Sequence, residues 1–92
     1  MKIGHGIKQV RKEAGLKQST LARTAGVSQT YLSLVEGGDK SNPSFELVQR
    51  IAEACKVHPI VVYLSALEPT DIEGNHANFT FTKNHAIKLF KH

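Results

Sequence analysis

Hydrophobic residues recur at helical spacing along the first two-thirds of the chain. The first run places Ile3, Ile7, Val10 and Ala14 on one face, and Gly15 follows where a left-handed cap would end a helix. Further runs of this kind cover residues 17–25, 28–36, 44–55 and 58–67. The pattern predicts five short helices with tight connections, which is typical of a compact all-α domain.

The hydrophobic pattern changes beyond Pro69. Residues 68–84 are rich in turn-forming residues, and the letters NFTFT at residues 78–82 alternate as they would in a short strand. The letters HAIKLF at residues 85–90 fit either a helix or a strand. We therefore expect a domain over residues 1–67 and a C-terminal extension over residues 68–92 that adds a strand or a helix. Phe79 and Phe81 could dock this extension on the domain.

One predicted helix begins with a cluster of polar residues. Ser28 is a good N-cap, and Leu32 and Val35 are placed to face the core. The residues left on the outer side are Gln29, Thr30, Ser33 and Leu34. This arrangement suits the major groove of DNA, where glutamine can pair with adenine through two hydrogen bonds and serine or threonine can reach several bases. Taken alone, the pattern also fits a capped surface helix with exposed polar residues.

The positive charge of the chain is unevenly distributed. Residues 1–67 hold nine lysines and arginines against five acidic residues, giving +4, whereas residues 68–92 hold three of each. A positive surface favours an anionic partner, although many small basic proteins have none. Any such partner is expected to contact the first two-thirds of the chain.

Patterns of catalytic and metal-binding residues are absent from the sequence. The five histidines lack metal-ligand spacing, no carboxylate pair or phosphate-binding glycine loop occurs, and the single cysteine, Cys55, lies on an apolar helix face. We therefore expect no enzyme, no metal and no cofactor. No leader is recognisable and no apolar run approaches the ~18 residues needed to span a bilayer, so the sequence predicts a cytoplasmic protein without a membrane partner.

Residues Leu16 to Val57 contain a glutamine at the start of the second helix, followed in order by the letters LA, AGVS, YLS, EGG and NPSFELV. In this order and spacing, the segment resembles the lambda-repressor/Cro-like (Xre-type) helix-turn-helix family. The resemblance extends over residues 3–67. It implies a five-helix DNA-binding domain whose third helix enters the major groove.

The resemblance also implies roles for individual positions. The residues that would contact base edges are Gln29, Thr30, Ser33 and Leu34. The residues that would contact phosphates are Lys17, Gln18, Ser28, Tyr31, Lys40, Ser41 and Asn42. Arg11 and Glu36 match a structural ion pair that bridges the first and third helices.

Several positions depart from the pattern of this family. Lys17 occupies an N-cap that usually holds Thr, Ser or Asn, at a cost of about 0.5–2 kcal/mol, although a lysine there could reach a phosphate. Lys56 replaces the usual glycine after the fourth helix, so a left-handed cap would be strained there. Leu34 replaces a polar residue, and could contact a thymine methyl group, a partner or its own domain. Asp39 opposes Lys40, which predicts modest affinity of this loop for phosphate.

These observations predict a sequence-specific regulator of transcription, most simply a repressor, that binds double-stranded DNA. Because so small a domain covers few base pairs, we expect a homodimer on an inverted-repeat operator, with apolar residues of the fifth helix and the extension available for the contact. The alternative is an antitoxin-like protein that binds a protein partner through its extension and autoregulates its own operon. A controller of a restriction-modification system would differ only in its target genes.

Overall fold

The helices follow the predicted hydrophobic runs. The computed structural model describes residues 1–39, 42–71 and 78–90. Its elements are α1 (Ile3–Glu13), α2 (Gln18–Ala25), α3 (Gln29–Glu36), α4 (Phe45–Ala54), α5 (Pro59–Ala66), the 3₁₀ turn η1 (Pro69–Asp71) and α6 (Phe79–Leu89). The described residues contain no strand. The prediction of an all-α fold with five helices before the extension is therefore confirmed.

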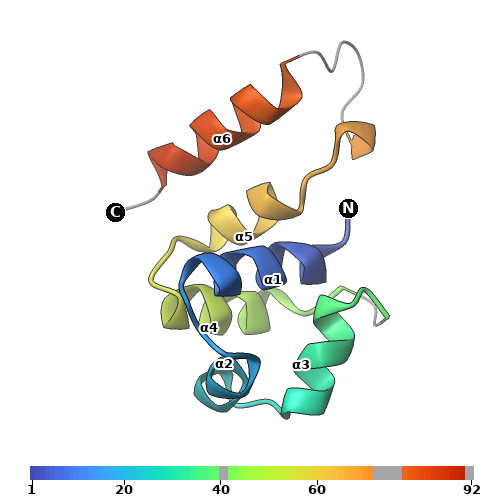
Figure 1. Ribbon diagram of the computed structural model, residues 1–92, viewed down its shortest axis with the longest axis vertical. Helices are drawn as coiled ribbons and strands as arrows, with labels where there is room; N and C mark the ends of the chain where they lie inside the picture. The colour runs from blue at the N-terminus through green and yellow to red at the C-terminus, as the bar shows by residue number, and fades with distance from the viewer. Residues whose placement is uncertain (40–41, 72–77, 91–92) are drawn as a thin grey trace.

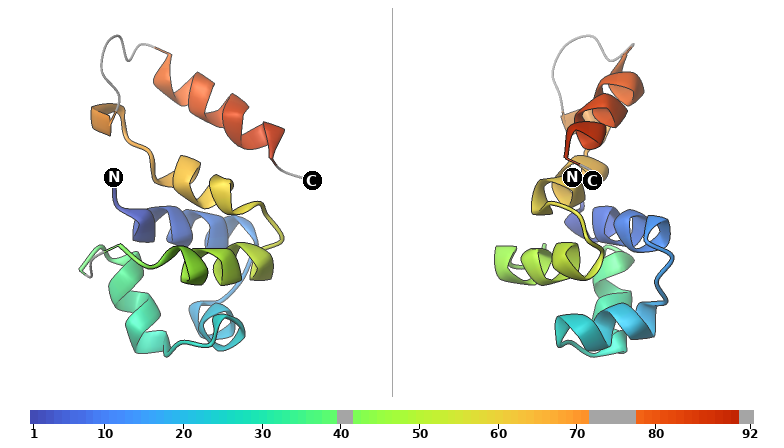
Figure 2. Two further views of the ribbon diagram at one scale, coloured as in Figure 1. Left: turned by 180° about the vertical axis from the view of Figure 1, so that it is seen from behind. Right: turned by 90° about the vertical axis from the view of Figure 1, so that its left-hand side faces the viewer.

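The helices form three groups along the long axis of the molecule. Figure 1 shows α1, α4 and α5 in the middle, α2 and α3 at one end, and α6 at the other, and the two views in Figure 2 show the same order. None of the helices in the described ranges is long and apolar enough to cross a bilayer. The outer side of α3 is thus far from the C-terminal extension.

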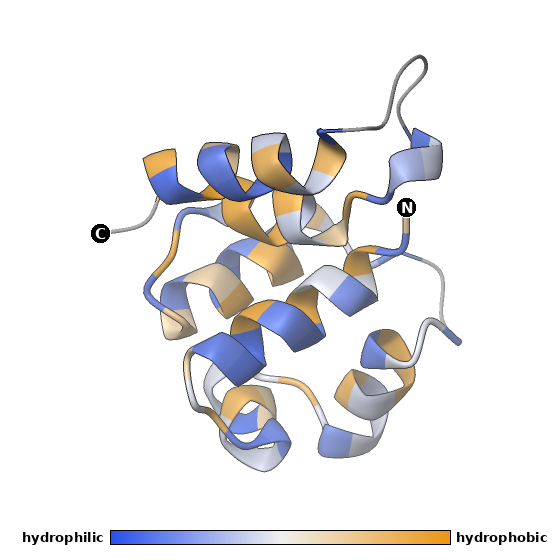
Figure 3. Cartoon of the chain, turned by 45° about the horizontal axis from the view of Figure 1, so that its top comes forward, coloured by the Kyte–Doolittle hydropathy of each residue, from blue (hydrophilic) through white to orange (hydrophobic). Residues whose placement is uncertain are grey.

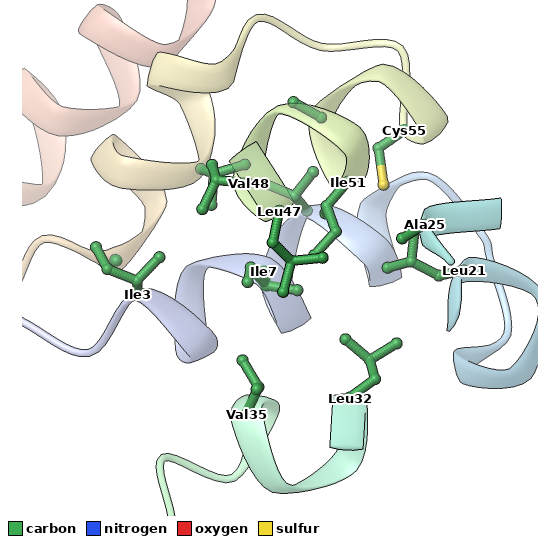
Figure 4. Packing of buried hydrophobic residues seen from close by; sticks show 14 of the residues in the cluster. Ile3, Ile7, Leu21, Ala25, Leu32, Val35, Leu47, Val48, Ile51 and Cys55 are labelled. Atoms are coloured by element: carbon green, nitrogen blue, oxygen red, sulfur yellow. The ribbon is translucent and has the colours of Figure 1, made fainter. Parts of the chain in front are cut away.

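A single hydrophobic core joins the first five helices (Figure 4). Its largest fully buried side chains are Ile7, Leu21, Leu32, Val35, Val48, Ile51, Val61 and Val62. Cys55 is also buried within this cluster, as its place on an apolar face predicted. Because every one of these helices contributes to one core, the orientation of α3 is fixed by packing from several sides.

Two glycines allow α1 to approach its neighbours closely. A Cβ atom at Gly4 would overlap with the backbone carbonyl of Val35 in α3, and a Cβ atom at Gly6 would overlap with the carbonyl of Val62 in α5. The sequence pattern did not identify either glycine as a packing residue, because both interrupt the apolar run without showing which helices cross there. Glycine destabilises a helix relative to alanine, and the close packing of α1 against α3 and α5 offsets this cost.

Two residues that depart from the family pattern, Lys17 and Lys56, lie at helix ends. Lys17 is the N-cap residue of α2 and makes no side-chain hydrogen bond there, as expected. Lys56 has a φ angle of 59°, so a non-glycine residue does occupy the left-handed conformation after α4. His58 caps α5, because its Nδ1 accepts a hydrogen bond of 3.1 Å from the Ile60 amide.

The prediction of a strand over residues 78–82 is wrong, because this segment forms the N-cap and first turn of α6. The alternation of Phe79 and Phe81 suggested a period of two, but Ile87 and Phe90 pack against the core at helical spacing from Phe79. Phe79 is half-buried, whereas Phe81 is 75% exposed and does not dock on the domain. Tertiary contacts at one end of the segment therefore decide its secondary structure.

The extension packs along α5 in the antiparallel direction. Lys83 donates hydrogen bonds of 3.1 and 2.9 Å to the carbonyl oxygens of Ser65 and Leu67, at the end of α5. The Phe90 ring lies 5.5 Å from the His58 ring, at the start of α5. The middle and the C-terminal end of α6 are thus attached to α5, on the side of the molecule away from α3.

Candidate nucleic-acid interface

Helix α3 presents a polar side to solvent and an apolar side to the core. Leu32 and Val35 are 0% and 1% exposed, and Val27 packs against the same cluster. The residues on the outer side are Gln29, Thr30, Ser33 and Leu34, all of which are exposed. The exposed fraction of Leu34 is 37%, so part of this side chain is available for contact with another molecule.

The outer residues of α3 line a shallow hollow with the first residue of α2. The hollow has a volume of about 330 Å³ and is lined by Gln18, Gln29, Thr30, Ser33 and Leu34. Four of these positions were predicted to contact bases, and Gln18 was predicted to contact a phosphate. The fold therefore brings together residues from two helices that share one predicted ligand.

A buried ion pair lies behind this hollow. Arg11 donates hydrogen bonds of 2.8 and 2.9 Å from Nε and Nη2 to the Glu36 carboxylate, and a third of 3.0 Å from Nη1 to the Leu16 carbonyl. The hydrogen bond with Glu36 raises the pKa of Arg11 above its ordinary value. Glu36 is only 3% exposed, and the hydrogen bonds from Arg11 replace the contacts with water that burial removes from its carboxylate.

The ion pair also orients Gln18. The Gln18 Nε2 donates a hydrogen bond of 3.2 Å to Glu36 Oε1. One N–H of the amide is used in this bond, which leaves the second N–H and the carbonyl oxygen available toward the hollow. No local sequence pattern indicated this bond, because Gln18 and Glu36 are far apart in the chain.

The start of α2 has free hydrogen-bond donors beside Gln18. The first amides of any helix have no partner within the helix, and Lys17 provides no side-chain cap for them. The helix dipole also makes this end positive. An exposed lysine and unpaired amides next to Gln18 suit a phosphate group.

Ser28 and Tyr31 have structural contacts as well as their predicted role. The Ser28 Oγ accepts a hydrogen bond of 3.0 Å from the Tyr31 amide and so caps α3. The Ser28 hydroxyl can still donate to another group. Tyr31 is half-buried and packs against the edge of the core.

The segment after α3 contains three predicted phosphate-binding residues. Lys40 and Ser41 lie outside the described residues. Asn42 is exposed, and its Oδ1 accepts a hydrogen bond of 3.2 Å from the Ile3 amide at the start of α1. This side chain therefore caps α1 from a distant part of the chain, while its NH₂ group can still donate to a phosphate.

The described side chains offer no metal site. Within residues 1–39, 42–71 and 78–90, no group of three His, Cys, Asp or Glu side chains could hold a metal ion. Burial raises the pKa of the Cys55 thiol to about 11, so this cysteine is a poor nucleophile. The hollow beside α3 instead combines amide, hydroxyl and methyl groups, which are the groups that contact base edges.

Comparison with known proteins gives a consistent set of similarities. A sequence model described as helix-turn-helix matches residues 7–62. The chain is 42% identical over 72 residues to the HTH-type transcriptional regulator SinR of Bacillus subtilis (strain 168) and 36% identical over 72 residues to SinR of Bacillus licheniformis. In both cases the match covers 78% of this chain and 64% of the relative.

A solved structure has the same fold. The complex titled SinR protein/SinI protein contains a chain that matches with a TM-score of 0.60 and 30% sequence identity. The match covers 90% of this chain and 78% of the other. This similarity therefore includes residues beyond the five-helix domain.

Proposed function

This chain belongs to the lambda-repressor/Cro-like helix-turn-helix family, and on that premise we propose that it regulates transcription by binding specific sequences of double-stranded DNA. The named relatives are HTH-type transcriptional regulators, which agrees with this proposal. The chain spans 64% of the length of these relatives.

The observation that carries the proposal is the shared hollow of α2 and α3. Gln29, Thr30 and Ser33 project from the first turns of an exposed helix whose opposite side is locked into the core. In the proposed complex these side chains contact base edges in the major groove, and the start of α2 binds a phosphate of the adjoining backbone. The polar end of α3 is thus the end that reads the sequence.

We propose that two copies bind together. One copy of α3 can contact only a few base pairs, so specificity in a genome requires a second copy on a half-site about one helical turn away. The simplest regulatory outcome is repression, because a dimer that occupies its operator excludes other proteins from the same DNA.

Selection from a random pool of duplexes tests this proposal. The purified protein is incubated with the pool at about 0.15 M salt, where weak binding through phosphates alone is suppressed, and the retained DNA is sequenced. We expect an enriched inverted repeat, whose spacing gives the distance between the two copies of α3. Enrichment of a single half-site would contradict the dimer, and no enrichment would contradict sequence-specific binding.

A second candidate function is binding of a protein partner through the extension. The outer side of α6 exposes Phe81 and Leu89, with exposed fractions of 75% and 70%, and the His85 ring stacks on Phe81 at 6.4 Å. Exposed apolar residues at this spacing are typical of helices that bind in a groove. The SinR chain of similar structure was solved with a protein partner, which favours this candidate as an addition to DNA binding.

Replacement of the exposed apolar residues separates the two functions. The variant Phe81→Ser/Leu89→Ser keeps α3 unchanged, and is compared with Thr82→Ser, a change at an exposed position of the same helix. We expect the double variant to lose its binding to the partner or to a second copy, and sedimentation measures this loss as a smaller particle. Each separate domain should still bind a half-site of DNA. Equal sedimentation and equal DNA binding for both variants would remove this role from α6.

A further inference from the structure

The outer face of α1 carries positive charges that the predicted contacts do not use. Lys2, His5, Lys8 and Lys12 fall on one side of the helix because their spacing is three or four residues. All four are exposed, and none of them forms an ion pair with a described carboxylate. Figure 3 shows hydrophilic and hydrophobic residues alternating along α1, as expected for a helix with one face in the core.

Of the charges on this face, only Lys12 has a structural explanation, because a cation in the last turn of α1 is favoured by the helix dipole. Lys8 and Lys12 are one turn apart, and like charges at this spacing repel each other in an isolated protein. The Glu13 carboxylate accepts a hydrogen bond from Gln9. Residues 2–12 nevertheless hold four of the nine lysines and arginines of the first 67 residues, and only Arg11 among them is paired.

One end of this face adjoins the proposed phosphate site at α2. A second hollow of about 350 Å³ lies between α1 and the end of α3, and is lined by His5, Lys8, Gln9, Lys12, Glu36 and Gly37. Glu36 of this hollow also accepts a hydrogen bond from Gln18 of the first hollow, so one hydrogen bond links the linings of the two hollows. Because Arg11 neutralises Glu36, this carboxylate does not repel an anion.

The other end of the face reaches the segment after α3. The side chains of Lys2 and His5 lie against Gly38, which follows α3. The same segment leads to Asn42, which binds the first residue of α1. The cationic face of α1 therefore connects the two segments that are proposed to contact the DNA backbone, at the start of α2 and after α3.

We propose that the face formed by Lys2, His5, Lys8 and Lys12 is a second phosphate-binding surface, which contacts the DNA backbone beside the groove occupied by α3. The inference rests on the proposed function and extends the bound DNA beyond the segments assigned above. These contacts are independent of sequence, because a lysine neutralises a phosphate whatever base it carries. They compensate for the loop after α3, where Asp39 opposes the lysine that follows it.

The salt dependence of DNA affinity tests the inference. Lys8→Ala and Lys12→Ala are compared with the unchanged protein, on a duplex from the selection and on a duplex of random sequence, between about 50 and 200 mM salt. We expect each variant to lower the slope of log affinity against log salt by about one, and to weaken binding by the same factor on both duplexes.

Lys88→Ala is the matched control. Lys88 is an exposed helical lysine on α6, away from α3, and its replacement changes the net charge by the same amount. If Lys8→Ala and Lys12→Ala change the salt slope no more than Lys88→Ala does, the proposed phosphate-binding role of the α1 face is wrong, while the proposed function stands. If the unchanged protein binds neither duplex, both are overturned.

Discussion

The Gln18 amide donates a 3.2 Å hydrogen bond to the Glu36 carboxylate, which Arg11 holds from the other side. Through this contact, a buried ion pair between α1 and α3 determines how the first residue of α2 faces solvent. The three helices that form the proposed DNA surface are therefore joined by a single carboxylate. Loss of that arrangement should affect stability and DNA binding together.

Replacement of Arg11 should destabilise the protein strongly. Arg11→Ala leaves the Glu36 charge buried without its partner, and a loss of about 3–5 kcal/mol in the free energy of unfolding is expected. Urea denaturation of the variant measures this loss. The neighbouring Lys12→Ala is the control, because Lys12 is exposed and unpaired among the described residues, and should change stability by less than about 0.5 kcal/mol. Similar losses for both variants would show that the ion pair contributes little.

Replacement of Gly6 should also destabilise, against the usual effect of helix propensity. Alanine normally stabilises a helix relative to glycine, but a Cβ atom at Gly6 would overlap with the Val62 carbonyl oxygen. Because a backbone atom cannot move aside cheaply, Gly6→Ala should lower the free energy of unfolding by about 1–3 kcal/mol. The urea midpoint measures this, with His5→Ala on the exposed side of the same helix as control. A more stable Gly6→Ala variant would contradict the close approach of α1 and α5.

The five-helix fold could be predicted because its signals are local. Helical spacing of apolar residues, Gly26 after α2 and Pro59 at the first position of α5 each determine structure within a few residues. The extension could not be predicted in the same way. Its first residues alternate as in a strand, whereas the contacts of Lys83, Ile87 and Phe90 with distant residues favour a helix.

In the candidate site too, some residues could be placed from local sequence patterns and others could not. The outward direction of Gln29 follows from the periodicity of α3 alone, since Leu32 and Val35 must face the core. The hydrogen bond between Gln18 and Glu36 joins residues that are 18 positions apart in the chain. The hydrogen bond between Asn42 and the Ile3 amide of α1 joins residues that are 39 positions apart. Such contacts depend on how helices pack, so the sequence assigns these residues only through its resemblance to a family.

The conformation of Lys56 makes a prediction about strain. A φ angle of 59° costs a residue with a Cβ atom about 1–2 kcal/mol. Glycine avoids this cost, but it loses more conformational entropy on folding, which cancels part of the gain in stability. We expect Lys56→Gly to raise the free energy of unfolding by about 0.5–1 kcal/mol. Lys56→Ala is the control, because alanine keeps the Cβ atom and should give no such gain. Equal stability of the two variants in urea would indicate that this turn is unstrained.

The reactivity of Cys55 should depend on folding and on pH. Burial raises the pKa of this thiol to about 11, so about one molecule in a thousand carries a thiolate at pH 8. Labelling by iodoacetamide at pH 8 should therefore be much slower in the folded protein than in urea. Because the folded state favours the neutral thiol, stability should fall as pH rises from the ordinary thiol pKa toward 11. Equal labelling rates in the folded and unfolded protein would contradict the burial of Cys55.

Gln29 gives the sharpest test of sequence reading. Its side chain is exposed at the start of α3, where it can form two hydrogen bonds with one adenine. Gln29→Ala should lose about 1–3 kcal/mol of binding free energy on the selected duplex and little on a duplex of random sequence. Gln49→Ala, an exposed change on α4, controls for the loss of an amide elsewhere on the surface. Fluorescence anisotropy with both duplexes measures the difference, and an equal loss on the two would mean that Gln29 contacts the backbone and not a base.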